Sequence, residues 1–453
     1  MKENYLAGVV EGFYGKTWSQ TERLTLLKQM SDWGLNTYFY APKDDLKHRA
    51  IWRKCYTEAE LAGLKELIAA CSQQRVRFVY GLSPGLDIRF SDPAELDTIK
   101  QRLSQLIDVG AQHFALLFDD LPGEMTESDL QTFDSVAAAQ SSVTNSIFTW
   151  LREQFDDSRL LFCPTPYCDR MDRWNLGGDD YLDQIGQHLE AGIDCLWTGP
   201  EIISKEITAE SIQSLASRIG REPVIWDNLH ANDYDLRRLF CGPYCGRPAE
   251  TVKLVGGIFA NPNNEFGINF VPLKTMADCL NDPDTYEPRS AYTKAVSDWL
   301  SSYESVRTAL SIEDLTFLAD CYYLPFEDGE QAVQLQEVVS YLMNNPVDSW
   351  GDRHEQFLEY HRRITAIFDT LTELHDRELF YAWSRRIWEM REEMGLIKSY
   401  LEQRQSGADE SQGFALEHHL LHTCRGGVAA KLQRQTTLDA QGRFHVNQQD
   451  TSQ

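Results

Sequence analysis

Two periodicities of apolar and polar residues alternate along the first 280 or so residues. Short apolar runs predict buried strands, and the longer amphipathic runs between them predict helices. Ser19-x-x-Glu22 and Thr57-x-x-Glu60 are capping boxes, and Asp92 before Pro93 is a further helix start. The predicted strands are 6–10, 36–40, 76–80, 113–118, 159–163, 194–197, 223–226 and 253–260. Further helices are expected near 128–153, 179–190, 207–219 and 270–280.

This alternation of strands and helices is typical of parallel βαβ units in an α/β fold. A doubly wound open sheet would give the same order of elements. The eight strands and the length of about 280 residues favour a closed (β/α)8 TIM barrel. No glycine-rich phosphate-binding motif opens a helix, so a nucleotide site lacks support.

The pattern changes after about residue 285. Helical periodicity covers 291–310, 312–323, 330–343, 353–374 and 377–403, and prolines at 325 and 346 interrupt it. We therefore predict a barrel domain over 1–285 and an all-α helical bundle over 286–440. The polar residues 441–453 are expected to form a flexible tail.

Composition narrows the classes of partner. The chain has 43 Lys and Arg against 69 Asp and Glu, a net charge of −26. Such a surface disfavours nucleic acid and anionic membrane. The sequence has no long apolar window, and Glu3 and Asn4 lie where a signal peptide would be apolar. We expect a cytoplasmic protein.

Neither the cysteines nor the histidines predict a metal site. The ten cysteines include no C-x-x-C pair, and Cys241 and Cys245 have no second pair after them. His418, His419 and His422 lack the glutamate of an H-E-x-x-H motif, so they are interpreted as a helix face. We expect reduced thiols, no metal and no organic cofactor.

Polar residues directly follow most of the predicted strands. In a (β/α)8 barrel these positions share the rim that carries the active site. Acids, amides, a lysine and aromatic rings together suit a carbohydrate site. They occur in the runs 11–15, 40–45, 118–120, 164–168, 226–234 and 261–264.

The pair Asp119-Asp120 is the most informative of these features. A helix cap beside a solvated acid would also explain it. Most glycosidases place two carboxylates about 5–9.5 Å apart, on opposite sides of the scissile bond. Neighbouring residues have Cα atoms only about 3.8 Å apart, so they approach one side of a sugar more naturally. This arrangement favours one acid that protonates the leaving oxygen and another that orients a nucleophile belonging to the substrate, such as a 2-acetamido group.

The strand ends resemble those of glycoside hydrolase family 84, which includes protein O-GlcNAcase and bacterial β-N-acetylglucosaminidases. The matching runs cover residues 8 to about 264, nearly the whole predicted barrel. They are GVVEGFYG, LNTYFYAPKDDLKHR, SPGLDIRFSDP, FALLFDD, LWTGPEIISKEI, VIWDNLHANDYD, RLFCGPY and NPN.

The resemblance implies a role for each matching position. Asp120 would be the general acid/base, and Asp119 would hold the acetamide N–H while the acetamide oxygen attacks C1 to form an oxazoline. Tyr167 would support that oxygen. The other positions would bind the sugar or its acetamido group, with Trp226 as an aromatic wall: Gly12, Lys43, Trp226, Asn228, Asp233 and Asn261.

Each position also has a structural explanation when taken alone. Lys43 is then better explained by a surface ion pair with Asp44 or Asp45. Tyr167 and Trp226 would be core residues, and Gly12 a turn residue. Asn228, Asp233 and Asn261 would cap or shape loops. However, packing alone would not place all of these residues after the strands of one rim.

The resemblance implies a retaining exo-β-N-acetylglucosaminidase acting on terminal β-linked GlcNAc, including O-GlcNAc on Ser or Thr of proteins. Two alternatives stay open: a glycosidase acting on hyaluronan-like polymers with a nucleophile of its own, and a non-catalytic sugar-binding or scaffold protein. A homodimer through the helical domain is a further expectation. The sequence does not specify the natural aglycone.

Overall fold

The computed structural model describes residues 2, 4–407, 413, 426–441 and 443–447. Contacts divide the chain into two compact units. The first comprises Met1–Asp233, Tyr244–Asn264 and Leu273–Glu287. The second comprises Tyr234–Pro243, Glu265–Pro272 and Pro288–Gln453. Whether a boundary near residue 285 separates independently folding domains stays a prediction.

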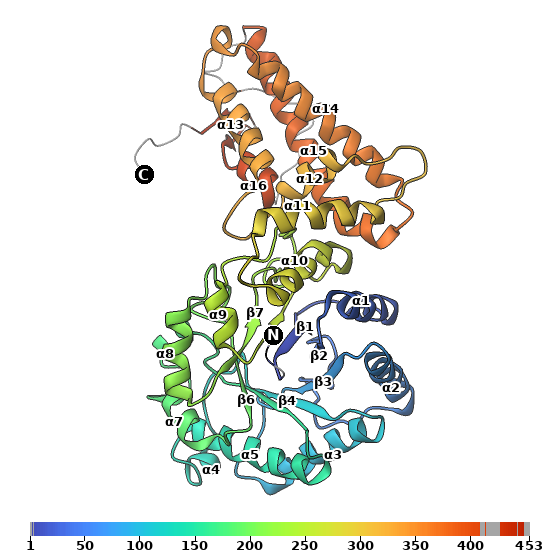
Figure 1. The fold of residues 1–453 in the computed structure, drawn as a ribbon. Coiled ribbons are helices and arrows are strands. Elements are labelled where there is room, and N and C mark those ends of the chain that lie inside the picture. The colour runs from blue at the N-terminus through green and yellow to red at the C-terminus, as the bar shows by residue number, and fades with distance from the viewer. Residues whose placement is uncertain (1, 3, 408–412, 414–425, 442, 448–453) are drawn as a thin grey trace. The chain divides into compact units, whose positions relative to one another are not determined.

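The first unit is a closed barrel of eight parallel strands, which confirms the predicted fold class. Each strand pairs with the next one along the chain, and β1 closes the ring by pairing with β8. Figure 1 shows this ring with helices outside it. The strands are β1 (Leu6–Glu11), β2 (Thr37–Tyr40), β3 (Arg77–Leu82), β4 (His113–Leu117), β5 (Leu160–Cys163), β6 (Asp194–Trp197), β7 (Pro223–Asp227) and β8 (Gly257–Ala260).

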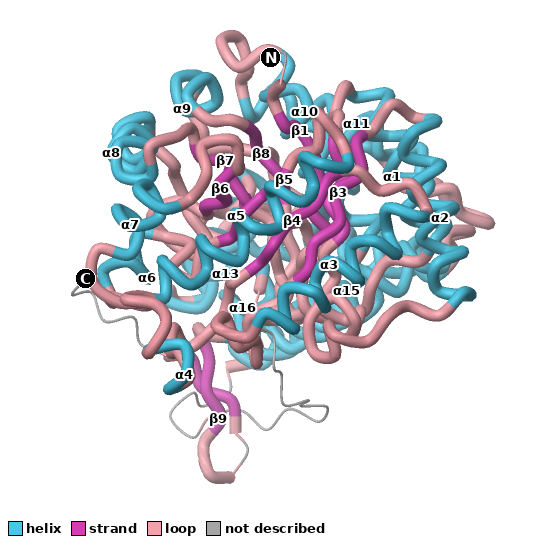
Figure 2. Tube along the Cα trace, turned by 90° about the horizontal axis from the view of Figure 1, so that it is seen from below, coloured by secondary structure: helices cyan, strands magenta, loops and turns pink. Residues whose placement is uncertain are grey.

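The helices that connect the strands begin at the predicted local signals. Ser19 and Thr57 both form complete capping boxes, and the Asp92 side chain caps the helix that starts at Pro93. Helices surround the strands in Figure 2 as well. They are α1 (Gln20–Trp33), α2 (Glu58–Gln73), α3 (Pro93–Asp108), α4 (Glu127–Leu130), α5 (Val136–Gln154), α6 (Asp169–Arg173), α7 (Tyr181–His188), α8 (Ala209–Ile219), α9 (Ala249–Leu254) and α10 (Phe270–Asn281), with the 3-10 turn η1 (Phe266–Asn269).

Two predictions for elements of the first unit are wrong. The eighth strand begins at Gly257, not at residue 253, because Lys253 and Leu254 form the last turn of α9. The run 128–153 is two helices, because the Ser135 side chain accepts a hydrogen bond from the N–H of Ala138 (3.1 Å) and starts α5 anew.

Buried ion pairs fix the ends of two barrel strands. Glu11, the last residue of β1, is fully buried and accepts two hydrogen bonds from Arg23 at 2.7 and 2.8 Å. Asp227, the last residue of β7, accepts from Arg247 (2.6 Å) and from Tyr244 (2.6 Å). Burial raises the pKa of Asp227, but the Arg247 charge and hydrogen bonds outweigh it, so this pKa is lowered overall. These pairs hold the strand ends from which the rim residues follow.

The second unit is helical, as the periodicity predicts, and six α-helices lie among its described residues. The expected helix over 291–310 ends at Trp299, because the chain then turns and its backbone pairs with distant residues, as Val306 N–H does with the carbonyl of Glu373 (3.1 Å). The helices are α11 (Pro288–Trp299), α12 (Ile312–Asp320), α13 (Glu330–Asn344), α14 (Arg353–Thr372), α15 (Arg377–Gln405) and α16 (Gly427–Gln433), with 3-10 turns η2 (Leu300–Ser302) and η3 (Val347–Ser349).

A short hairpin joins β9 (Thr436–Leu438) and β10 (Phe444–Val446) and is visible in Figure 2. Its second strand falls in the range where the sequence predicts a polar tail. Phe444 explains the difference, because its ring is buried and lies 5.4 Å from that of Tyr400. No helix in the described ranges is long and apolar enough to cross a membrane.

Candidate active site

The neighbouring acids Asp119 and Asp120 follow β4 at the carboxyl-end rim of the barrel. Asp120 has φ +55°, in the left-handed region, which costs a non-glycine residue about 1–2 kcal/mol. In an extended strand, successive side chains point to opposite faces. The left-handed turn interrupts that alternation, and the contacts below place both carboxylates in one site.

The carboxylate of Asp119 is held by two cations. Its Oδ2 lies 2.7 Å from Lys43 Nζ and 3.7 Å from Arg49 Nη1, and the side chains of Lys43 and Asp119 are only 4% and 14% exposed. Burial raises the pKa of Asp119. The charges of Lys43 and Arg49 lower this pKa by more than burial raises it, so it lies below its usual value. Asp119 is therefore ionised at neutral pH. Its Oδ1 is buried and has no hydrogen-bond partner within the described part of the chain.

Asp120 accepts one phenolic hydrogen bond on each oxygen. Tyr167 donates to Oδ1 (2.8 Å) and Tyr14 donates to Oδ2 (3.0 Å). Burial and then the Asp120 charge raise the pKa of both tyrosines, so both remain neutral donors. Asp120 is itself exposed, and Tyr14 is 45% exposed, so a ligand has access to this acid.

The amide and aromatic residues form an adjoining group on the same rim. Asn228 Oδ1 accepts from Trp226 Nε1 (3.1 Å) and from Asn261 Nδ2 (2.9 Å). The Asn261 Oδ1 is buried without a hydrogen-bond partner among the described residues. A Cβ on Gly12 would lie 2.2 Å from Cζ2 of Trp226, so only glycine fits against this indole.

Tyr14 links Asp233 to the acid pair. Its backbone N–H donates to Asp233 Oδ2 (2.9 Å), and its hydroxyl donates to Asp120. Tyr167 and Trp226 also belong to one apolar cluster of the barrel. The nine residues predicted from the sequence thus lie at one end of the barrel. Direct contacts join Lys43 to Asp119 and Tyr167 to Asp120, and Asp233 is joined to Asp120 through Tyr14. Gly12 adjoins Trp226, and Asn228 bonds to both Trp226 and Asn261.

One of the structural explanations given above is wrong. Lys43 pairs with Asp119, whereas Asp45 accepts from the hydroxyls of Tyr40 and Tyr56. Tyr167 is a core residue, and its hydroxyl also donates to Asp120.

Sequence reasoning missed two residues that contact the acids. Tyr14 is within the EGFYG run after β1, where the same rule of strand ends points to it. Arg49 donates to the carbonyl oxygens of Asp119 (3.1 Å) and Asp120 (3.2 Å). It lies well beyond the end of β2, inside a long connection, so distance from the strand gave no signal.

The described residues contain no cluster of three or more His, Cys, Asp or Glu side chains arranged to hold a metal. The nine described cysteines form no disulfide. His418, His419 and His422 lie outside the described residues.

The model of the β-N-acetylglucosaminidase family matches residues 7–312 of this chain. The chain belongs to this family. The resemblance to glycoside hydrolase family 84 is thereby confirmed. Among curated proteins, the chain is 48% identical to the protein O-GlcNAcase of Mus musculus and 47% identical to that of Rattus norvegicus, over 273 residues in each case. These matches cover 60% of this chain and 30% of each relative, so the chain spans under a third of their length.

A solved structure covers more of the chain. An aspartate-to-asparagine mutant of the O-GlcNAc hydrolase of Thermobaculum terrenum aligns with a TM-score of 0.76 and 29% identity. The alignment covers 88% of this chain and 84% of that one. The β-N-acetylglucosaminidase family is a family of glycoside hydrolases, and the barrel carries the nine predicted residues at the rim where such enzymes act.

Proposed function

We propose that the protein is a retaining exo-β-N-acetylglucosaminidase that removes terminal β-linked GlcNAc, including O-GlcNAc from Ser or Thr of proteins. The observation that carries the proposal is the difference between the two acids. Lys43 and Arg49 keep Asp119 ionised. Asp120 is exposed, and its carboxylate accepts hydrogen bonds from two neutral phenols. Neighbouring carboxylates with distinct surroundings suit distinct roles in one reaction.

In the first step, Asp120 donates its proton to the glycosidic oxygen while the C1–O bond breaks. The acetamido carbonyl oxygen of the substrate forms a new bond to C1, which gives an oxazoline ring that is still protonated on nitrogen. Asp119 holds the acetamide N–H during this attack, and its unpartnered buried Oδ1 supports that role. Tyr167, beside Asp120, would support the acetamide oxygen.

In the second step, water attacks C1 and gives its proton to Asp120. The C1–oxygen bond of the oxazoline breaks, which restores the acetamide and releases GlcNAc with its β configuration retained. We assign sugar or acetamido binding to Gly12, Lys43, Trp226, Asn228, Asp233 and Asn261. No step requires a metal or an organic cofactor.

Asp120→Asn tests this assignment. The variant keeps the shape of the side chain but has no proton to donate, so turnover of GlcNAc on a poor leaving group should fall about 10²- to 10⁴-fold. Binding of a thiazoline that mimics the oxazoline should persist. Full activity of Asp120→Asn on the poor leaving group would show that another residue is the acid.

The same thiazoline separates this mechanism from that of a glycosidase with its own nucleophile, because tight binding requires participation of the acetamide. Turnover of an aryl β-GlcNAc glycoside excludes a non-catalytic sugar-binding protein. A homodimer through the helical unit stays a prediction, which light scattering would check.

A further inference from the structure

Arg49 contacts both acids, although it lies on a different connection of the barrel. Its side chain is 8% exposed, and its Nη1 donates to Ser83 Oγ (2.8 Å) and to the carbonyl oxygen of Asp119 (3.1 Å). Its Nη2 donates to the carbonyl oxygen of Asp120 (3.2 Å). We infer that Arg49 is a positioning residue that fixes the backbone of the acid pair, an inference that rests on the proposed function.

The backbone at this point needs such support. Asp120 is in the left-handed region at φ +55°, and isolated non-glycine residues adopt it only when their surroundings impose it. One planar guanidinium bridges two successive carbonyl groups of that turn, so it fixes the direction in which both carboxylates leave the chain. A shift of the turn would move Asp120 away from the leaving oxygen and Asp119 away from the acetamide.

Arg49 is itself held firmly against the end of β3. The neighbouring His48 is fully buried, its Nδ1 lies 2.8 Å from the carbonyl oxygen of Gly81, and its own carbonyl accepts from Ser83 N–H (2.9 Å). Ser83, which accepts from Arg49, is also fully buried. Two neighbouring residues of the connection from β2 to α2, His48 and Arg49, therefore both form hydrogen bonds at the end of β3.

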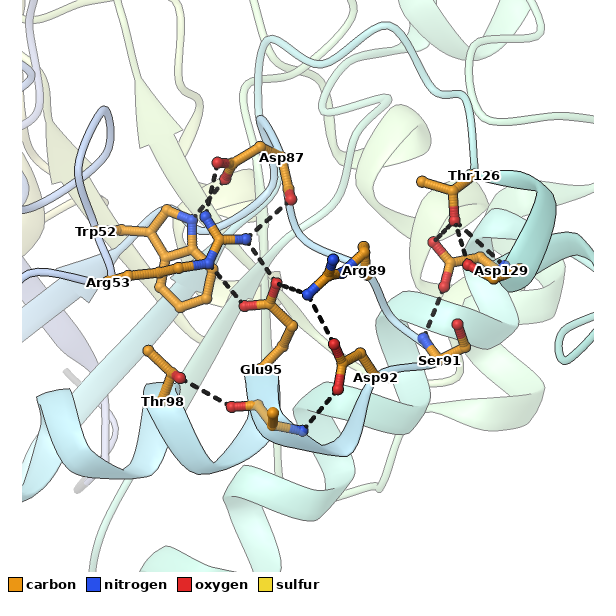
Figure 3. Close-up of polar contacts among 12 residues, drawn as sticks. Trp52, Arg53, Asp87, Arg89, Ser91, Asp92, Glu95, Thr98, Thr126 and Asp129 are labelled. Carbon is orange, nitrogen blue, oxygen red and sulfur yellow. Dashed lines mark hydrogen bonds and ion pairs between the residues drawn. The ribbon is translucent and has the colours of Figure 1, made fainter.

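The next residues on this connection bind the segment after β3, as Figure 3 shows. Trp52 Nε1 donates to Asp87 (2.8 Å), and Arg53 forms ion pairs with Asp87 (2.6 Å) and Glu95 (2.7 Å). Arg53 is thus also an arginine, and it lies on the same connection as Arg49. Its ion pairs are with Asp87 and Glu95 and not with the acids at 119 and 120, which makes it a matched control.

Positive charge and shape are separable at this position. Nη1 of Arg49 lies 3.7 Å from Asp119 Oδ2, so part of its effect is electrostatic. A lysine retains that charge but is a point donor that does not reproduce the fork across two carbonyls. If positioning is the main role, Arg49→Lys should be defective despite its charge.

The test compares wild type, Arg49→Lys, Arg49→Met and Arg53→Met on two β-GlcNAc glycosides. One has a dinitrophenyl leaving group, which needs little protonation, and the other has a serine peptide. For both Arg49 variants we expect kcat on the glycopeptide to fall about 10- to 100-fold, with a smaller loss on the dinitrophenyl glycoside and KM within about threefold. Arg53→Met should keep kcat within about twofold on both substrates, even if it unfolds at a lower temperature.

Wild-type kcat on both substrates in Arg49→Lys would overturn the inference, as would an equal loss on both substrates. An equal loss in Arg53→Met would also overturn it, because the defect would then be general loosening of the connection. A wild-type protein that hydrolyses neither glycoside would overturn the proposed function, and the inference with it. Active wild type with unaffected Arg49 variants would overturn the inference alone.

Discussion

Replacing Lys43 with methionine removes the closest cation to Asp119 while keeping most of the side-chain volume. At 2.7 Å the pair has a Coulomb energy of about 6 kcal/mol at an effective dielectric constant of about 20, most of which offsets the desolvation of the carboxylate. The remaining Arg49 cation lies 3.7 Å from the same oxygen. Since burial then opposes a weaker attraction, the pKa of Asp119 should rise in Lys43→Met.

The sign of the pH effect follows from this direction. In the wild type the pKa of Asp119 is lowered, so the ionised acid that the oxazoline step requires persists down to acidic pH. In Lys43→Met the acidic limb of kcat/KM should move to higher pH. A depressed carboxyl pKa also stabilises the fold above the unfolded pKa of about 3.9, and this stability is lost as pH falls through the folded pKa. The variant should therefore lose more stability at pH 7 than at pH 4.

The assay is a profile of kcat/KM on an aryl β-GlcNAc glycoside, followed from neutral pH down through the acidic limb of the wild type. Lys47→Met is the matched control, because Lys47 is on the same connection but pairs with Glu60. The control should keep the wild-type acidic limb. Coincident limbs in Lys43→Met and wild type would refute the reasoning, since the charge of Lys43 would then not set the ionisation of Asp119.

Two further substitutions test the support of the rim. Gly12→Ala places a Cβ 2.2 Å from Trp226 Cζ2. We therefore expect the free energy of unfolding to fall by about 1–3 kcal/mol, measured by thermal unfolding, and KM to rise. A Cβ added at Gly63 would meet no heavy atom within 4 Å outside its own helix backbone, so Gly63→Ala should leave KM unchanged. Equal KM values in the two variants would contradict this account. Arg247→Met leaves Asp227 buried without its ion pair and should cost about 3–5 kcal/mol in urea unfolding at pH 7. Because the lowered pKa of Asp227 depends on Arg247, this loss should shrink at lower pH, and a pH-independent loss below about 1 kcal/mol would argue against the pair.

Much of the fold could be predicted from the sequence, because many helix starts and strands depend on interactions between near neighbours in the chain. The capping boxes at Ser19 and Thr57 and the apolar run of β4 are set by residues a few positions apart, so their patterns survive in one dimension. Parallel strands of a barrel bring their carboxyl ends to one rim, so counting strands was enough to place Asp119 near Lys43 and Tyr167.

The tertiary structure alone decided which side chains meet. Lys43 has acids beside it in the sequence, yet it pairs with Asp119, 76 positions away. Arg49 reaches the turn after β4 from a long connection, and Asp120 adopts a left-handed backbone that its residue type disfavours. Which side chains pair depends on the paths of the loops and on the balance between burial and charge at each site. Those quantities exist only once the barrel has closed, which is why the sequence predicted the rim but not its contacts.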